Sequence, residues 1–154
     1  MDTRMIDSVA EAEKVIVGIG EDWEGRGDVA VTGYENLKKL LEGKDYYIIS
    51  VCDDGVIEGI GFDADRLVTP KDETDDKWDA YNEWLGRTLN RKVCLLELGV
   101  GLKYPGVIRW PFEKITFVNN KAIMYRVHNM LYQTTPEMGE KCIGIKADAL
   151  EYMA

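Results

Sequence analysis

The sequence predicts an α/β fold in which one parallel sheet lies between two layers of helices. Several of its apolar segments are continuous rather than alternating, and such segments are typical of strands buried on both faces. These segments alternate along the chain with segments whose apolar residues have helical spacing. The length of 154 residues suits one core, so we expect residues 1–154 to form a single domain.

The strands are predicted mainly from the composition of three segments. Residues 14–20, 46–51 and 93–98 are runs of β-branched, aromatic and aliphatic residues, the second of them reading YYIISV. Shorter runs of the same kind add weaker strands, at 66–68, 115–118, 122–126 and 143–145.

The predicted helices fill the gaps between these strands. Residues 34–42 place Leu37, Leu40 and Leu41 at helical spacing before Gly43, which is a common stop residue. Residues 78–89 carry an aromatic stripe that is typical of a core-facing helix. Ser8 would cap a helix over 8–13, and further helical segments are expected at 56–61, 105–114, 136–141 and 148–153.

Two glycine turns follow apolar strands. Gly18 and Gly20 end the first strand in the sequence GIG, and Gly99 and Gly101 follow the 93–98 strand in the sequence GVG. The carboxyl ends of parallel strands meet at one edge of a sheet, where ligands bind in open α/β folds. A phosphate site therefore competes with the alternative that these glycines serve the turns alone.

Several segments resemble the sirtuin family, in the same order along the chain. The segment ELGVGLKYPGVIRWPFE, residues 97–113, is the most specific, and it is similar to an outlying microbial branch that includes macrodomain-linked sirtuins. Looser similarity covers KVIVGIG at 14–20, the stretch at 49–70, FVNN at 117–120 and residues 145–149. The resemblance implies a Rossmann-like NAD-binding fold.

The resemblance also implies roles for individual residues. NAD or ADP-ribose would be the ligand, and Asp54 would lie towards its nicotinamide end. Asp54 and Glu97 are the candidate acid/base residues, because both carboxylates are expected near the same edge. The candidate cofactor-binding residues are Gly18, Gly20, Gly99 and Gly101 for the pyrophosphate, Asn119 for the adenosine ribose, and Lys146 and Ala147 for the adenine.

The sequence also departs from the sirtuin pattern. Cys52 stands where the family has an asparagine, and no histidine follows Val68–Pro70, where the family's catalytic histidine would lie. Glu21, Asp22 and Glu24 would place negative charge near a pyrophosphate. The four-cysteine zinc ribbon is absent, so the small zinc-binding domain and any metal site are not expected.

Other side chains have structural alternatives. Arg109 could pair with a phosphate, or it could form a structural ion pair with Glu97 or Glu113, and the sequence favours neither alternative. The single histidine, His128, reads better as a surface or core residue than as a base. Trp78 and Trp84 read as core residues, although a homo-oligomer could also pair through their helix.

Composition limits the partners. A formal net charge of −9 argues against a nucleic-acid or anionic-membrane surface, and the acidic run at 72–79 reads as a solvated loop and helix start. The charged amino terminus lacks a signal peptide, and the three cysteines form no CxxC pair, so we expect a cytoplasmic protein with reduced thiols.

Three functions follow from these observations. The first is a sirtuin-like domain that binds NAD or ADP-ribose, with reduced or absent deacylase activity. The second is an NAD-dependent deacylase, ADP-ribosyltransferase or NAD hydrolase whose base is not a histidine. The third is a non-catalytic scaffold of the same fold, which Cys52 and the acidic first turn favour over the second.

Overall fold

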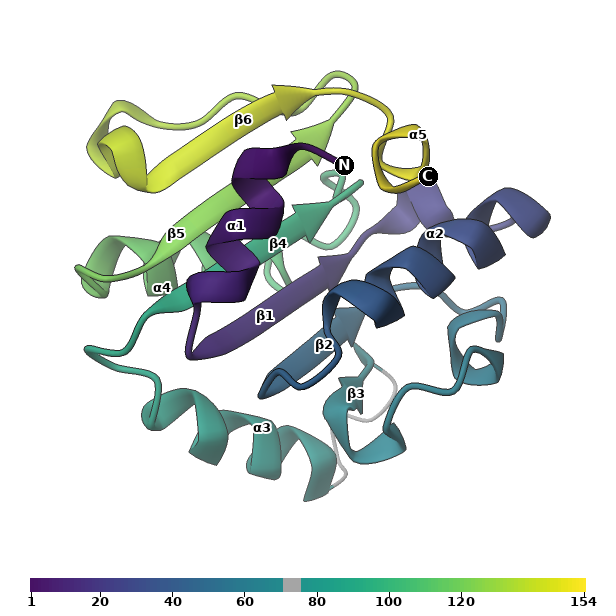
Figure 1. Cartoon of the computed structure of the whole chain (residues 1–154), viewed down its shortest axis with the longest axis horizontal. Helices are drawn as coiled ribbons and strands as arrows, with labels where there is room; N and C mark the ends of the chain where they lie inside the picture. Colours follow the sequence, from purple (N-terminus) through teal and green to yellow (C-terminus); the bar gives the residue numbers. More distant parts are fainter. Residues whose placement is uncertain (71–75) are drawn as a thin grey trace.

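The computed structural model describes residues 1–70 and 76–154 and confirms the three-layer α/β fold (Figure 1). Six strands form one sheet in the order β3-β2-β1-β4-β5-β6, and every neighbouring pair is parallel. This order is that of Rossmann-like sheets. The strands are β1 (Lys14–Ile19), β2 (Tyr46–Ser50), β3 (Leu67–Val68), β4 (Val93–Leu98), β5 (Ile123–His128) and β6 (Cys142–Lys146).

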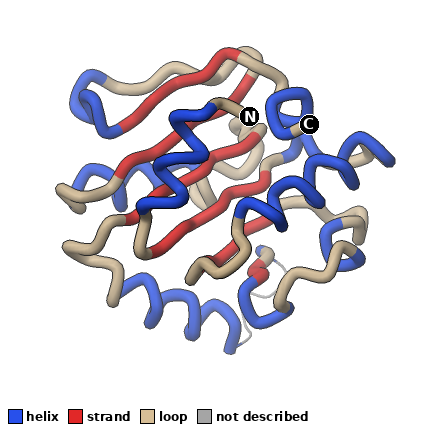
Figure 2. The backbone as a smooth tube through the Cα atoms, in the orientation of Figure 1, coloured by secondary structure: helices blue, strands red, loops and turns tan. Residues whose placement is uncertain are grey.

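Helices cover both faces of the sheet (Figures 1 and 2). One face packs against α1 (Thr3–Glu11), α2 (Asp28–Leu40) and α5 (Ala149–Met153), which share a core cluster with Val15 and Val17 of β1. The other face packs against α3 (Asp76–Gly86) and α4 (Arg109–Val118), which share a second cluster with Ile16. Successive residues of β1 thus point into different cores, which explains why its sequence is apolar without a break.

Asp2 and Asp148 cap the amino-terminal ends of α1 and α5. The sequence predicted Ser8 as the cap of the first of these helices and no capping residue for the second. Asp2 accepts a hydrogen bond from the backbone N–H of Arg4 and caps α1, so this helix begins before Ser8. Ser8 instead hydrogen-bonds the hydroxyl of Tyr125. Asp148 accepts from the N–H groups of Leu150 and Glu151 and caps α5.

The strand expected at 115–118 is wrong, because these residues form the last turn of α4. Their β-branched and aromatic side chains favour a strand locally, but Phe112 and Thr116 are buried with the spacing of a helix face. The Thr116 hydroxyl donates to the carbonyl of Phe112, a bond that a helix provides. Tertiary packing here outweighs local propensity.

The remaining differences are shifts of ends. Helix α2 begins at Asp28 rather than near residue 34, and β5 extends to His128. Short 3₁₀ turns lie at Glu21–Trp23 (η1), Ile57–Gly59 (η2), Ala64–Arg66 (η3) and Pro136–Lys141 (η5). Of the acidic run at 72–79, residues 72–75 lie outside the described residues, and Asp76 begins α3.

The cysteines agree with the expectation of reduced thiols. Cys52, Cys94 and Cys142 are all buried and free. Within residues 1–70 and 76–154, no group of three or more His, Cys, Asp or Glu side chains could hold a metal ion. None of the helices in these two ranges is long and apolar enough to cross a membrane.

Candidate functional site

The two glycine turns meet at the carboxyl edge of the sheet. They follow β1 and β4, which are neighbours in the sheet and mark the point where the strand order reverses. The N–H of Gly20 donates to Leu98 O over 3.0 Å, and the N–H of Asp22 donates to Gly99 O over 3.3 Å. A Cβ at position 20 would overlap the backbone of Gly99 and Val100. Glycine is therefore required at position 20 for the contact between the turns.

Trp23 fills the space under the first turn. Its side chain is fully buried, and its ring stacks on Tyr34 with 4.5 Å between the ring centroids. Its indole N–H donates to Leu98 O over 3.1 Å. This packing anchors η1 over the carboxyl ends of β1 and β4, where a Rossmann-like fold would admit a ligand.

Glu21 reaches across to the second turn. Its carboxylate accepts the N–H of Gly101 over 3.3 Å, and a Cβ at position 101 would overlap the same carboxylate. Backbone N–H groups in glycine turns are common ligands of anions. In this structure the anion on the turn is the protein's own side chain.

Gly18 and Asn119 have other roles. A Cβ at Gly18 would overlap Ile108, so Gly18 lets the start of α4 pack closely on the sheet. Asn119 follows α4 and precedes β5, at the amino-terminal edge, and its amide donates to the carbonyls of Thr88 and Arg91. The structure therefore does not bring Asn119 to the edge where the glycine turns lie.

Glu97 is engaged in a buried ion-pair network. Its carboxylate contacts Arg126 at 2.5 and 3.2 Å and lies 4.0 Å from Arg109. Arg126 also contacts Glu113 at 2.7 Å. Burial raises the pKa of Glu97, while the Arg126 guanidinium acts in the opposite direction. The charged residues of the segment at 97–113 thus hold α4 against β4 and β5. Of the two roles considered for Arg109, the structure shows the ion pair with Glu97.

Asp54 lies in the exposed loop after β2. Its carboxylate accepts the N–H groups of Gly25 over 3.0 Å and of Val56 over 3.2 Å. Glu97 instead faces the core under α4. The two carboxylates expected to act together therefore have different environments, one solvated and one buried.

His128 lies at the carboxyl end of β5 beside Asp22. Its Nε2 is 3.4 Å from Asp22 Oδ2, and its Nδ1 accepts the N–H groups of Met130 and Leu131. An Nδ1 that accepts two hydrogen bonds carries no proton, so Nε2 is the protonated nitrogen and faces the carboxylate. Desolvation raises the pKa of Asp22, and His128 opposes that shift. Sequence reasoning missed this pair, since only the register of β5 brings His128 to the edge.

Lys146 and Ala147 lie next to the same edge. Lys146 pairs with His128 in the register of β5 and β6, and the N–H of Ala147 donates to His128 O over 3.3 Å. Arg26 lies 3.4 Å from Asp148, in the segment that follows Ala147. This side of the edge therefore carries exposed cationic groups beside the acidic first turn.

A small pocket opens at the carboxyl ends of β2 and β3. It has a volume of about 200 Å³ and is lined in part by Cys52, Asp53, Thr69 and Tyr104. The Cys52 thiol donates to Gly20 O over 3.4 Å, so the pocket adjoins the first glycine turn. Sites for whole small molecules usually measure about 300–1,000 Å³, so this pocket suits one ring of a larger ligand.

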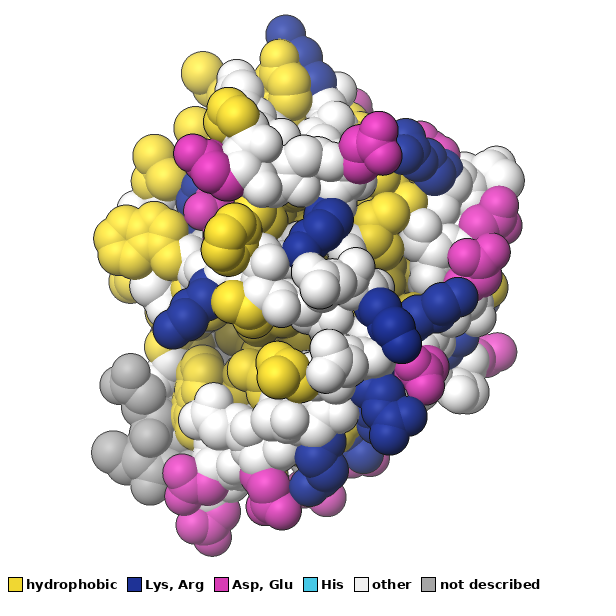
Figure 3. Space-filling view, turned by 90° about the vertical axis from the view of Figure 1, so that its left-hand side faces the viewer, with side chains coloured by type: hydrophobic (Ala, Val, Ile, Leu, Met, Phe, Trp, Pro, Cys, Tyr) yellow, Lys and Arg dark blue, Asp and Glu magenta, His cyan; other side chains and the backbone are white. Residues whose placement is uncertain are grey.

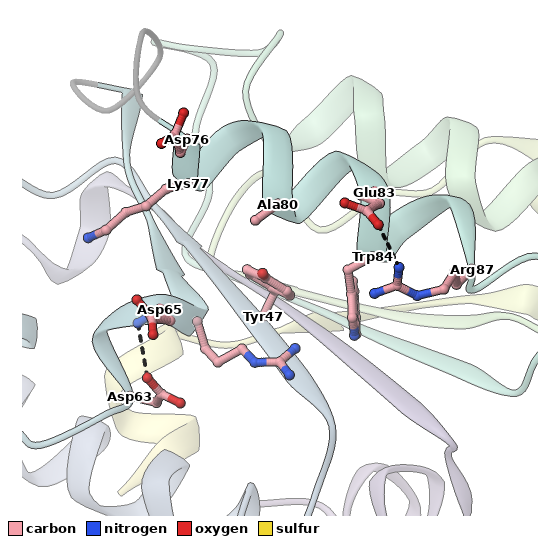
Figure 4. A pocket seen from close by; sticks show the side chains of 10 residues that line it. Tyr47, Asp63, Asp65, Asp76, Lys77, Ala80, Glu83, Trp84 and Arg87 are labelled. Carbon is pink, nitrogen blue, oxygen red and sulfur yellow. Dashed lines mark hydrogen bonds and ion pairs between the residues drawn. The ribbon is translucent and has the colours of Figure 1, made fainter.

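A larger cavity, about 660 Å³, lies elsewhere, between η3 and α3 (Figure 4). Tyr47 and Trp84 form its aromatic floor, and Arg66 lies over the Tyr47 ring at 4.9 Å. Arg66 also pairs with Asp45, and Arg87 pairs with Glu83. Both arginines of the cavity thus form ion pairs within the chain. None of the predicted catalytic or cofactor-binding residues lines the cavity.

The fold and this edge define a class of protein, a Rossmann-like domain with its two glycine turns at the switch point of the sheet. No family model matches the chain. A stretch of 68 residues is 29% identical to a protein named "Protein ADP-ribosyltransferase" from Staphylococcus aureus (strain Mu50 / ATCC 700699). That stretch is 44% of this chain and 22% of the relative, so the chain spans about a fifth of the relative's length.

A solved structure shares the fold. It is an exopolyphosphatase-related protein from Bacteroides fragilis, with a TM-score of 0.51 and 13% sequence identity. The similarity covers 92% of this chain and 38% of the other. At this identity the match shows the fold alone. Neither relative bears the sirtuin name, so the comparisons support the Rossmann-like fold and an ADP-ribosyltransferase relative, and not the sirtuin family itself.

Proposed function

We propose that this chain binds NAD or ADP-ribose at the carboxyl edge of its sheet. The observation that carries the proposal is the contact between the GIG and GVG turns at the switch point, which is where dinucleotides bind in this fold class. The named relative supports the same ligand class, because ADP-ribosyl transfer uses NAD as its donor.

The ligand would lie across the edge. A phosphate oxygen would accept the hydrogen bond that the N–H of Gly101 now donates to Glu21, because a phosphate and a carboxylate are both anions that accept such bonds. The pocket beside Cys52 would hold one ring at the Asp54 end, and Lys146 and Ala147 would face the other end. Binding therefore requires Glu21 to swing away, while Trp23 can stay in place.

Ligand binding is tested by thermal unfolding with NAD, ADP-ribose and AMP. A ligand at about 100 times its dissociation constant stabilises the folded state by about 2.7 kcal/mol, which raises Tm by roughly 5–10 °C in a domain of this size. If none of the three ligands at about 1 mM raises Tm, the scaffold hypothesis replaces this one.

Gly101→Ala and Gly106→Ala form a matched pair for this test. A Cβ at position 101 meets only the end of the Glu21 side chain, so the fold tolerates it, but it occupies the space proposed for the phosphate. A Cβ at position 106, in the same loop, has no neighbour within 4 Å. We expect Gly101→Ala to abolish the ligand-induced shift and Gly106→Ala to retain it.

A second candidate function is ADP-ribosyl transfer, which the name of the relative favours. In that reaction a nucleophile displaces nicotinamide from C1′ of the NAD ribose, and a base takes the proton of the nucleophile. Asp54 is the better candidate of the two predicted carboxylates, since Glu97 is held in ion pairs. Nicotinamide release from NAD, lost in Asp54→Ala, would support it, whereas release that survives Asp54→Ala excludes Asp54 as the base.

A further inference from the structure

An apolar groove separates α3 from α4 on the side of the molecule away from the glycine turns. It has a volume of about 400 Å³, and its apolar lining includes Leu85, Leu89, Pro111, Ile115 and Val118. Figure 3 shows hydrophobic side chains gathered around a hollow on the left half of this face. Leu89 and Val118 are 59% and 54% exposed, so the lining extends onto the open surface.

The outer stripe of α4 adds two large aromatic side chains to this face. Trp110 is 62% exposed and Phe117 is 57% exposed. They are seven residues apart, with Lys114 between them, and therefore lie on one side of the helix. Phe112 and Thr116, on the opposite side, are buried against the sheet. Together Trp110 and Phe117 expose roughly 200–300 Å² of ring surface, near the size of the largest apolar patch on a typical monomer.

The charge of this surface is unlike that of the rest of the chain. The chain has 28 Asp and Glu residues, but the lining of the groove includes no Asp or Glu from residues 1–70 and 76–154, and it does include Lys114. Two copies with a net charge of −9 repel each other least where acidic side chains are absent. Asp79 of α3 is exposed and precedes Asn82 by about one helical turn, so it lies beside the groove rather than in its lining and offers a partner for a lysine of α4 in another copy.

We propose that this chain forms a two-fold symmetric homodimer through the α3–α4 groove and the outer stripe of α4. In a two-fold contact the same patch serves both partners, so a ridge and a hollow on one face can fill each other. The Trp110 and Phe117 ridge enters the groove of the second copy, and Lys114 meets Asp79 at its rim. Stable interfaces bury about 800 Å² per partner, so this contact has to include the lining of the groove and its polar rim as well as the two aromatic side chains.

Sedimentation velocity of the full chain over about 1 to 500 µM tests the dimer directly. We expect a concentration-dependent dimer that becomes tighter in about 0.5 M salt, because salt screens the repulsion between two acidic copies. Phe117→Glu should weaken the dimer more than roughly tenfold, since it places a carboxylate at the centre of the contact.

Val29→Glu is the matched control, because Val29 is 50% exposed and lies on α2, which covers the other face of the sheet. It should dimerise like the wild type. A wild-type chain that stays monomeric over the whole range, or a Phe117→Glu variant that dimerises as tightly as wild type, overturns the proposal. Circular dichroism of each variant confirms that a loss of the dimer is not a loss of the fold.

This contact replaces the surface that the sequence suggested. Trp84 is 3% exposed and packs against Tyr47 and Tyr81, with ring centroids 4.9 and 6.4 Å apart. Trp78 is half-buried and donates to Thr69 O over 2.8 Å. Both tryptophans belong to the packing of α3 on the sheet, so the proposed contact does not use them.

Discussion

Glu97 and Arg126 lie opposite each other on β4 and β5 and form a two-pronged ion pair inside the core. Both side chains are 1% exposed. The remaining N–H groups of Arg126 reach Glu113 of α4 and the carbonyl of Gln133. The pair thus joins the sheet, a helix and a loop through one guanidinium group.

Removing that guanidinium should destabilise the protein strongly. Arg126→Met keeps a long apolar side chain but leaves Glu97 buried without its main partner, and we expect a loss of about 3–5 kcal/mol in the free energy of unfolding. Urea unfolding measures it. Arg87→Met is the control, because Arg87 and Glu83 are 62% and 77% exposed and such pairs contribute about 0–1 kcal/mol. Equal losses in both variants would contradict a special role for the buried pair.

The contact between the two glycine turns makes a second prediction. In Gly20→Ala the new Cβ meets the backbone of Gly99 and Val100, which cannot move aside as a flexible side chain could. We expect a loss of at least about 2 kcal/mol, seen as a lower Tm. Gly59→Ala should change stability by less than about 1 kcal/mol, since no atom lies within 4 Å of its Cβ. If Gly20→Ala lowered the stability by less than about 1 kcal/mol, the two turns would separate easily.

The buried Trp23 allows a third test. Trp23→Ala removes the ring that stacks on Tyr34 and the donor to Leu98 O, and it leaves a cavity under the first turn. Substitutions of this kind cost about 3–5 kcal/mol. Met130→Ala, at an exposed position, should lie within about 0.5 kcal/mol of wild type in the same urea titration. A small effect for Trp23→Ala would show that η1 is loosely held and that the edge opens readily.

Much of the fold was accessible from the sequence because burial on both faces leaves a local signal. The bounds of β4 were predicted correctly, and β1 and β2 to within one residue, from unbroken apolar runs. The sequence could not separate the end of α4 from a strand, because Ile115 to Val118 are β-branched or aromatic and only packing on the sheet makes them helical.

The site was less accessible, because its contacts join distant segments. The glycine turns were found from their strands, but nothing local shows that Trp23 turns inward or that Glu21 reaches Gly101. The meeting of Asp22 and His128 depends on strand order and register, which a single sequence does not encode in any short pattern.

The partial burial of the Asp22 carboxylate beside His128 predicts that the stability of the protein depends on pH. Desolvation raises the folded-state pKa of Asp22, so the unfolded chain ionises at a lower pH than the folded one. Above the folded pKa the ionised carboxylate then lowers stability, and below the unfolded value of about 3.9 the effect is gone. Asp22→Asn should therefore be more stable than wild type at pH 7, and the difference should disappear towards pH 3. Unfolding curves at both pH values measure it, and a less stable Asn variant at pH 7 would contradict the desolvation argument.

The three thiols give the last prediction. Burial raises the pKa of Cys52 and Cys142 to about 11 and that of Cys94 to about 12. The thiolate is the reactive form, so all three should react with a disulfide reagent at pH 8 only as fast as the structure opens, and at once in denaturant. Cys52 lines the pocket at the carboxyl edge, whereas Cys94 is fully buried near the amino end of β4. A local opening of that edge therefore exposes Cys52 first, and ADP-ribose should slow its labelling more than that of Cys94. Mass spectrometry of the labelled peptides separates the two, and equal protection of both would mean that the ligand stabilises the fold without covering this edge.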